Sequence, residues 1–366
     1  MYGPDHITTD QLPGRTLSIN GAEYLFCSGT SYLGISCNEA FRQCLLDGMQ
    51  RYGTNYSSSR NSNLQLQVFD EVENYLAAYT GAAAALTMSS GYLAGQVVVQ
   101  ALKDEGRFLY APGTHPAMWR SMADAPDDGR THVEWVNQLL QEAPRLPDEH
   151  LILVCNSLDP LKAEKYTFDW VAALPDNKQI TLIVDDSHGF GVTGDNGAGV
   201  YRQLRQLQSI RKMRLVVISS FGKAFGIPAG LILADSPFIE QLKSSPYFGG
   251  ASPAVPAYLY AFLHSKSIFE EARQKLLANI LYFRQRLACP ELFSSFEDYP
   301  VFYTSSEALC PYLLQHRVFI SSFRYPTPAD APITRVILNA LHTPEDLNRL
   351  AALINQFKEK DTSIKT

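Results

Sequence analysis

ITLIVDDSHGFG (residues 180–191) and LVVISSFGKAFG (residues 215–226) share one pattern. In each, a short apolar run rich in β-branched residues is followed at once by small, polar and charged residues. A nearly continuous apolar run of this length is typical of a strand buried on both faces of a parallel sheet. Ligands of open parallel sheets bind at the carboxyl ends of the strands. Asp185 and Lys223, which follow the two runs, are therefore candidate site residues.

Two more apolar runs, LILVC at 151–155 and GLIL at 230–233, extend the pattern. Helical or loop stretches separate the runs. Residues 64–79 show apolar positions at helical spacing, and a second helix is expected at 93–103. Alternation of this kind predicts an α/β fold with a largely parallel sheet covered on both faces.

The C-terminal region carries a helix start. Thr343 can cap a helix, Pro344 suits its first position, and Asp346 stands three residues after the cap. A strand is expected just before it, at 333–338, while the small polar residues 53–60 indicate a loop.

Composition excludes several classes of protein. The 366 residues carry a net charge of −6, which argues against general nucleic-acid binding. No apolar run reaches the roughly 18 to 20 residues that span a bilayer, and the N-terminus lacks the pattern of a signal peptide, so we expect a cytoplasmic protein that does not bind membranes. The six cysteines form no CxxC pair and suggest no metal site, so buried reduced thiols are expected.

Two motifs match a pattern without its context. Residues 189–194 (GFGVTG) fit the dinucleotide fingerprint, but they continue into turn-forming residues and lack an acidic residue about 20 positions on. Gly222-Lys223 resembles the end of a phosphate-binding P-loop, but Val217 stands where the first glycine belongs and Ala224 follows the lysine. We reject both.

The chemistry of pyridoxal 5′-phosphate (PLP) needs a lysine amine, a carboxylate for the pyridine nitrogen and donors for the phosphate. Lys223 lies between small and aromatic residues, where loss of solvent favours the neutral, nucleophilic amine. Asp185 ends a buried strand, where an unpaired carboxylate is costly and a pyridinium N–H would pair with it. Alone, each has an ordinary interpretation, a solvated lysine and a structural carboxylate.

The other requirements also have candidates. Ser90, Gly91 and Tyr92 open the helix expected at 93–103, and a helix start with free N–H groups binds phosphate readily. Ser220 can add a hydroxyl to the same anion. His115 can lie against the cofactor ring as an aromatic platform.

Two further side chains complete the set. His188 can reach the ring hydroxyl. Arg335, in the strand expected at 333–338, suits bidentate binding of a substrate carboxylate. Each has an ordinary structural interpretation, and their order along the chain is more specific than any one of them.

This order resembles the fold-type I PLP enzymes, and within them the α-oxoamine synthases. The similarity runs from about Tyr24 to the C-terminal helix. VDDSHGFG (184–191) is similar to the family's Asp-Glu-Ala-His-Gly-x-Gly, and SFGKAFG (220–226) to its Thr-Phe-Gly-Lys-x-Phe-Gly. YLFCSGTSYLG (24–34), SSFRYP (321–326) and RVILNALHT (335–343) resemble the family's first strand and C-terminal pattern.

The resemblance implies a role for each candidate. Lys223 would form the Schiff base, Asp185 would pair with the pyridinium and His115 would stack on the ring. Ring-hydroxyl contacts are implied for His188 and Ser157. The remaining roles fall to residues already named: phosphate binding to Gly91, Tyr92 and Ser220, and the substrate carboxylate to Arg335.

The sequence also departs from the family's pattern. It begins later than these synthases, so we expect less of the N-terminal helix that helps form their acyl-CoA site. Thr30-Ser31 replaces Asn-Asp, residues 155–168 are shortened, and FGGASP (248–253) replaces the Ser/Thr-rich segment that reaches the partner's phosphate. Most departures fall where the second substrate should bind.

The resemblance implies an aspartate aminotransferase-like fold. We expect a large domain at 45–245 with a mostly parallel seven-stranded sheet, and a smaller α/β domain from 1–44 and 246–366, in a homodimer. The leading hypothesis for function is decarboxylating condensation of an amino acid with an acyl thioester carried by CoA or an acyl-carrier protein.

Three alternatives remain. An aminotransferase shares the same chemistry up to the second substrate, and a lyase or decarboxylase needs no second substrate. A non-catalytic scaffold of this fold is a hypothesis of another class, and the presence of Lys223, Asp185, His188 and Arg335 argues against it.

Overall fold

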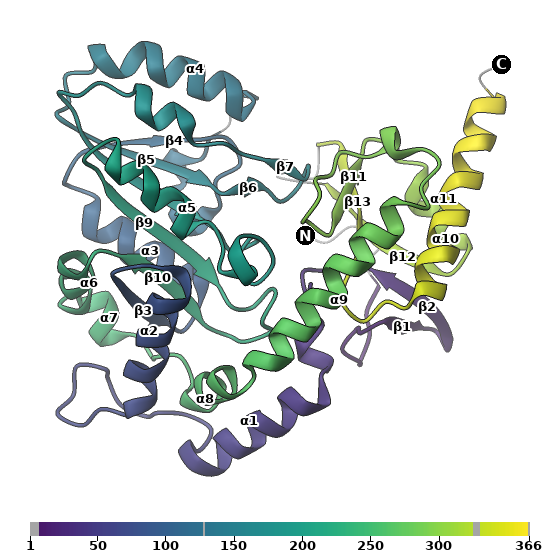
Figure 1. The fold of residues 1–366 in the computed structure, drawn as a ribbon, viewed down its shortest axis with the longest axis horizontal. Helices are drawn as coiled ribbons and strands as arrows, with labels where there is room; N and C mark the ends of the chain where they lie inside the picture. Colours follow the sequence, from purple (N-terminus) through teal and green to yellow (C-terminus); the bar gives the residue numbers. More distant parts are fainter. Residues whose placement is uncertain (1–6, 127–128, 325–329, 365–366) are drawn as a thin grey trace. The chain divides into compact units, whose positions relative to one another are not determined.

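The structure is a computed structural model that describes residues 7–126, 129–324 and 330–364 (Figure 1). The chain forms two compact units. The larger one comprises Glu39–Asp159 and Lys165–Ile268, and the smaller one comprises the residues up to Asn38, Pro160–Glu164 and the residues from Phe269 onward. In this division, segments 39–44 and 246–268 lie in the larger unit. The domain boundaries that we expected from the sequence, with these segments in the smaller domain, stay a prediction.

A six-stranded sheet forms the centre of the larger unit. Its strand order is β3-β10-β9-β8-β5-β4, one strand fewer in the described residues than the expected seven. The strands are β3 (Ala84–Met88), β10 (Gly230–Ala234), β9 (Arg214–Ser220), β8 (Gln179–Asp185), β5 (His150–Asn156) and β4 (Arg107–Tyr110).

Five of these strands share one direction. The pairs β4–β5, β5–β8 and β8–β9 are parallel, whereas β10 is antiparallel to both β9 and β3. Only residues 221–229 join β9 to β10, and a parallel crossover needs a dozen or more residues. The short connection therefore fixes the antiparallel strand, and the sheet is mostly parallel as expected.

Helices surround this sheet (Figure 1). They are α1 (Glu39–Tyr52), α2 (Gln67–Thr80), α3 (Gly91–Leu102), α4 (His132–Glu142), α5 (Tyr201–Arg205), α6 (Ser236–Lys243), α7 (Pro246–Gly250) and α8 (Pro256–His264). Alternate residues of the strands, such as Ile183, Val216 and Ile232, form one buried core with apolar residues of α3 and α6. The predicted helices at 64–79 and 93–103 are confirmed as α2 and α3, each displaced by two or three residues at its start.

The smaller unit has a five-stranded sheet of order β1-β2-β12-β13-β11. Its strands are β1 (Thr16–Ile19), β2 (Ala22–Cys27), β12 (Val318–Arg324), β13 (Pro332–Ile337) and β11 (Val301–Thr304). Most of α9 (Lys266–Arg284) belongs to this unit, with α10 (Leu309–Gln315) and α11 (Pro344–Ile364). The strand predicted at 333–338 is confirmed as β13.

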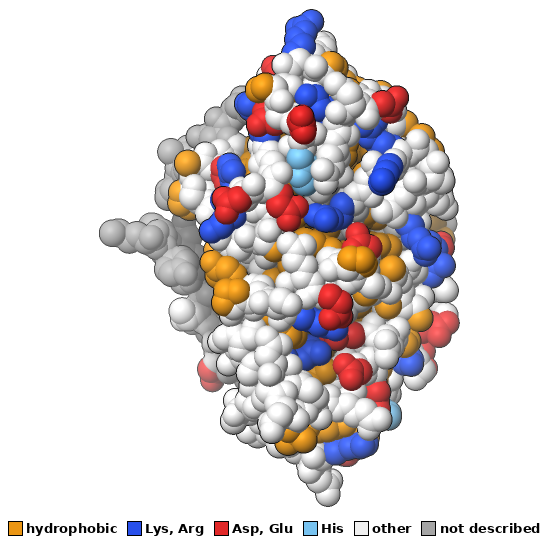
Figure 2. All heavy atoms as spheres, turned by 90° about the vertical axis from the view of Figure 1, so that its left-hand side faces the viewer, with side chains coloured by type: hydrophobic (Ala, Val, Ile, Leu, Met, Phe, Trp, Pro, Cys, Tyr) orange, Lys and Arg blue, Asp and Glu red, His pale blue; other side chains and the backbone are white. Residues whose placement is uncertain are grey.

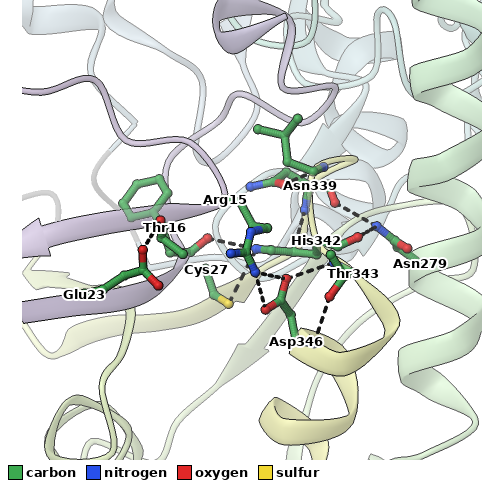
Figure 3. A network of polar contacts seen from close by, with 11 residues as sticks. Arg15, Thr16, Glu23, Cys27, Asn279, Asn339, His342, Thr343 and Asp346 are labelled. Atoms are coloured by element: carbon green, nitrogen blue, oxygen red, sulfur yellow. Dashed lines mark hydrogen bonds and ion pairs between the residues drawn. The ribbon is translucent and has the colours of Figure 1, made fainter.

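A polar network fixes the start of α11 (Figure 3). Thr343 N donates to Asp346 Oδ2 at 2.9 Å, and Asp346 N donates to Thr343 Oγ1 at 3.3 Å, which is the predicted cap. Arg15 also forms an ion pair with Asp346 at 2.9 Å. Beside them, the buried His342 accepts from Asn339 N through Nδ1 and shares a 2.9 Å hydrogen bond through Nε2 with the carbonyl oxygen of Phe26.

The outer surface shows mixed charge where it can be seen. On the face in Figure 2, acidic and basic side chains are interspersed, with small groups of hydrophobic side chains between them. Among the described residues, no helix is both long enough and apolar enough to cross a membrane.

Candidate active site

Lys223 lies in the turn that follows β9, as the sequence pattern predicted. Burial lowers the pKa of its amine, while the nearby carboxyls of Asp185 and Asp186 oppose that shift. Within the described part of the chain, no hydrogen bond or salt bridge involves its ammonium group. A desolvated amine of this kind holds its proton less firmly and is the more nucleophilic for it.

Aromatic rings pack around the turn that carries Lys223. The ring centroids of Phe190 and Phe225 are 5.0 Å apart, and those of Phe221 and Phe262 are 5.1 Å apart, both pairs edge to face. Within the turn, Phe221 N donates to Ala229 O at 3.0 Å. These contacts hold the backbone on either side of the lysine in place.

Asp185 is the last residue of β8, at the same edge of the sheet. It stands in register with Asn156 of β5 and Ile218 of β9. Its Oδ1 accepts a hydrogen bond from Ser187 N at 2.9 Å, and its side chain is only partly buried. The charge of Asp185 raises the pKa of both Lys223 and His115, so amine, carboxyl and imidazole lie close together.

His115 caps a single helical turn, Pro116–Met118. Its Nδ1 accepts from Ala117 N at 3.1 Å, so the neutral ring carries its proton on Nε2. Partial burial is the main cause that lowers its pKa. The hydrogen bond fixes the orientation of the ring, and the His115 side chain is exposed, so one ring face is open to a stacking partner.

The start of α3 supplies the candidate phosphate site. The Ser90 hydroxyl accepts from Leu93 N at 3.1 Å and caps the helix. A methyl group on Gly91 would lie 2.7 Å from Ser220 Cβ, so only glycine fits there. The Ser220 hydroxyl, which accepts from Gly222 N at 3.2 Å, thus lies against the helix start. The side chain of Tyr92 is 55% exposed.

Ser157 and His188 flank Asp185. Ser157 N donates to the carbonyl oxygen of Asp185 at 2.9 Å, and the buried Ser157 Oγ has no hydrogen-bond partner among the described residues. His188 is half-buried in the turn after β8. The larger unit thus brings together nine of the ten predicted site residues, namely Ser90, Gly91, Tyr92, His115, Ser157, Asp185, His188, Ser220 and Lys223.

Arg335, the tenth, lies on β13 of the smaller unit. Its guanidinium donates from Nη1 to Pro160 O at 2.8 Å and stands 5.2 Å from the ring centroid of Phe323. Tyr32 is a buried neighbour, and its hydroxyl lies 3.1 Å from that of Tyr299. Burial raises the pKa of Tyr32 to about 12, and the charge of Arg335 opposes that shift. Buried surroundings hold the guanidinium in one orientation.

One residue of the site was missed by sequence reasoning. Asp186 is 2% exposed and directly follows Asp185, and its carboxyl acts electrostatically on Lys223. The doublet Asp-Asp at the end of a buried strand was the available signal.

The residues present fit a PLP molecule. The desolvated Lys223 would carry it, and Asp185 would pair with its ring nitrogen. Gly91 lets the start of α3 approach Ser220 closely, and unpaired N–H groups of a first helical turn bind phosphate. The unpartnered Ser157 hydroxyl provides a further donor.

Comparison with known proteins decides the family. Residues 32–354 match the aminotransferase class I and II family. The chain belongs to this family. Its members are PLP-dependent enzymes, so the expected cofactor and the expected enzyme class are confirmed.

Comparison with individual proteins shows which enzymes the chain resembles in sequence. The 8-amino-7-oxononanoate synthase of Serratia proteamaculans is 29% identical over 357 residues, covering 93% of this chain and 91% of that protein. The same enzyme from Yersinia pestis (strain Pestoides F) is 29% identical over 360 residues with equal coverage. The resemblance to α-oxoamine synthases is therefore confirmed.

Solved structures of the family confirm the fold. Serine palmitoyltransferase of Sphingomonas wittichii aligns with a TM-score of 0.80 at 18% identity, over 97% of this chain and 92% of that one. The 8-amino-7-oxononanoate synthase of Francisella tularensis aligns with a TM-score of 0.72 at 21% identity, over 93% and 99%. The predicted α/β architecture of fold-type I is thus correct.

Proposed function

We propose that the protein joins an amino acid to an acyl thioester with loss of carbon dioxide. The observation that carries this proposal is the partly buried Lys223 beside Asp185 at the carboxyl ends of β8 and β9, in a chain whose full-length relatives are named 8-amino-7-oxononanoate synthase. In this reaction the amino-acid α-carbon bonds to the thioester carbonyl carbon, the thiol leaves, and the original carboxylate departs as carbon dioxide.

Bound PLP would supply the electron sink that makes the amino-acid α-carbon acidic. The chain's own residues would do the rest. Lys223 would take a proton at Nζ and return it, and burial, which lowers the pKa of its amine, favours the neutral form that can accept the proton. Asp185 holds a proton on the ring nitrogen through its carboxylate.

The remaining residues bind and orient. The N–H groups at the start of α3, with Ser220, hold the phosphate. His115, fixed through Nδ1, covers one face of the ring. Ser157 and His188 contact the ring hydroxyl, and Arg335 binds the carboxylate of the amino acid. All of these assignments are part of the proposal.

The test is a product assay on the PLP-loaded protein with a panel of amino acids and acyl thioesters. Release of free thiol together with carbon dioxide, lost in Lys223→Ala, supports the proposal and identifies both substrates. Thioesters of CoA and of an acyl-carrier protein are tested side by side, because both donors suit the reaction.

An aminotransferase is the second candidate, favoured by the family that the chain matches. It would transfer the amino group of one amino acid to a 2-oxo acid, turning the donor into its own 2-oxo acid, and would release neither thiol nor carbon dioxide. A panel of 2-oxo acids in the same assay separates the two functions.

We also propose a cytoplasmic homodimer. Tyr92, at the start of α3 beside the candidate phosphate site, is 55% exposed. Tyr247 of α7 is 46% exposed, and its hydroxyl donates at 3.4 Å to Gln100 near the other end of α3. A second copy that covers these rings would make the active site depend on both subunits. Light scattering of the purified protein measures the state. No disulfide joins any of the six cysteines, all of which lie in the described ranges, and this suits a reducing compartment.

A further inference from the structure

Asp186 organises the segment that follows β8. Its N–H donates to Ile218 O of β9 at 2.8 Å, and its carbonyl oxygen accepts from Phe190 N at 2.9 Å. Its carboxyl reaches fourteen residues along the chain, where Oδ2 accepts from Val200 N at 2.8 Å. Both ends of segment 187–199 are therefore attached to this one residue.

Glycines enclose the carboxyl of Asp186. A methyl group on Gly189 would lie 2.2 Å from Oδ1, and one on Gly199 would lie 2.1 Å from Oδ2. Gly199 also has a φ of +74°, which favours glycine. The backbone thus closes over both carboxyl oxygens and keeps solvent away from them.

Two buried oxygen atoms at this place have no hydrogen-bond partner within the described ranges. They are Asp186 Oδ1 and Ser157 Oγ. The Ser157 hydroxyl lies close enough to the Asp186 carboxyl to affect its protonation. A buried carboxylate with one N–H donor and an unused oxygen is costly, whereas a neutral carboxyl can use that oxygen as a donor.

Burial makes the neutral form of Asp186 accessible near neutral pH. Burial is the main cause that raises its pKa to about 7, and the negative charge of Asp185 adds to the shift. Ser157, the Val200 N–H and the charge of Lys223 act in the other direction. Adjacent carboxyls rarely both ionise at low cost, and the less buried Asp185 is the one suited to carry the charge.

We propose that Asp186 is a positioning residue whose neutral carboxyl donates from Oδ1 to Ser157 Oγ and so aims the Ser157 hydroxyl hydrogen at the ring hydroxyl oxygen of PLP. This inference rests on the proposed function, because it uses the cofactor position given there. A hydroxyl has one hydrogen to donate. If Asp186 were ionised, the Ser157 hydroxyl would donate its hydrogen to the carboxylate and could not donate it to the cofactor.

Infrared spectroscopy tests the protonation state directly. Unliganded protein should show a carboxylic-acid C=O band below about pH 7 that is absent from Asp186→Asn. Asp195→Asn is the matched control, since Asp195 lies in the same segment with its side chain 81% exposed. Absence of an Asp186-dependent band at acidic pH would overturn the proposal.

Titration of visible absorbance tests the link to Ser157. A lost donor to the ring oxygen raises the proton affinity of the lysine-bound cofactor, so Ser157→Ala should raise the midpoint by about one pH unit. Asp186→Asn should leave the midpoint unchanged, because the amide can donate to Ser157 and accept from Val200 N. Asp186→Ala should act like Ser157→Ala, and the double variant should add nothing further.

An ionised Asp186 would give a different result in this titration. Removal of a negative charge would lower the midpoint, so a lower midpoint in Asp186→Asn means that Asp186 is ionised and the inference is wrong. Should Asp186→Ala fail to fold, Asp186→Asn still decides the matter. Failure of the proposed function is separate: it appears as wild-type protein without covalently held PLP, or without product, while the infrared result stands by itself.

Discussion

Gly91 at the start of α3 lies directly against Ser220 at the end of β9. A methyl group at position 91 would stand 2.7 Å from Ser220 Cβ and 3.1 Å from its Cα. The two backbones can approach this closely only because glycine has no Cβ. This approach brings a helix start and a strand end together around the candidate phosphate site.

Gly91→Ala should therefore weaken PLP binding by at least about tenfold, because the helix start must move away from Ser220. The measurement is PLP affinity by fluorescence or absorbance titration of folded protein. Gly48→Ala is the matched control: its methyl group would lie 2.5 Å from Ala257 O in the α1–α8 contact, so it should lower stability without a specific loss of PLP affinity. Equal affinities in the two variants would contradict the assignment.

Lys223→Met should stabilise the protein without cofactor. The native state holds fewer protons at Lys223 than the unfolded chain does, because burial lowers the pKa. The buried amine therefore costs stability at neutral pH, and the cost shrinks as pH rises toward the unfolded value of 10.5. Thermal unfolding across this range should show a higher melting temperature for the variant than for the wild type at neutral pH. The difference between the two should decrease as the pH becomes alkaline. Covalent PLP, trapped with borohydride, should be lost in Lys223→Met and kept in Lys243→Arg.

Arg335→Lys should raise KM for the amino acid about tenfold or more with a smaller effect on kcat, because a lysine cannot bind a carboxylate in a bidentate manner. Steady-state kinetics with the identified amino acid checks this. Arg324→Lys, on the neighbouring strand and exposed, is the control and should behave as wild type. An unchanged KM in Arg335→Lys would remove Arg335 from the substrate site.

His132→Phe should make the protein less sensitive to acid. The buried His132 stacks on Tyr166 with ring centroids 3.9 Å apart, and burial lowers its pKa to about 4. The unfolded chain takes up a proton at about 6.5, so the native state loses stability as pH falls from there toward 4. Urea unfolding in this range should show a shallower decline for the variant. The exposed His264→Phe should leave the decline as it is.

Asp346→Ala should lower the free energy of unfolding by about 1 kcal/mol, since it removes the acidic half of the cap on α11. It also breaks the ion pair with Arg15. Arg15→Ala separates the two contributions, because it removes the ion pair and leaves the cap. Chemical denaturation measures both, and equal losses would mean that the cap contributes nothing.

The sequence allowed Lys223 and Asp185 to be placed, because Asp185 directly follows one apolar run, Lys223 lies a few residues after another, and parallel strands end at one edge. The helix cap formed by Thr343 and Asp346 could also be predicted, because its residues lie within one short stretch of sequence. The starts of α2 and α3 were placed three and two residues off, because helical periodicity does not report where a helix begins.

Asp186 could not be found in this way. Its role depends on Gly199 and Val200, which lie beside it although they follow it by more than ten residues, and on Ser157, which follows the strand β5. The fit of Gly91 against Ser220 likewise joins positions far apart in the sequence. The direction of β10 depended on the length of its connection to β9, and apolar composition carries no information about direction.

The connection between β9 and β10 has a consequence for how this protein can change over time. Ser220 and Gly230 pair across the base of segment 221–229, and Phe221 N bonds to Ala229 O just above them. Both ends of the segment are thus held together by hydrogen bonds, and an inserted or deleted residue would displace the lysine from its neighbours. Natural variation and laboratory evolution should therefore preserve its length and alter substrate choice elsewhere. A designer who transplants this site should move the two strands and their connection as one piece.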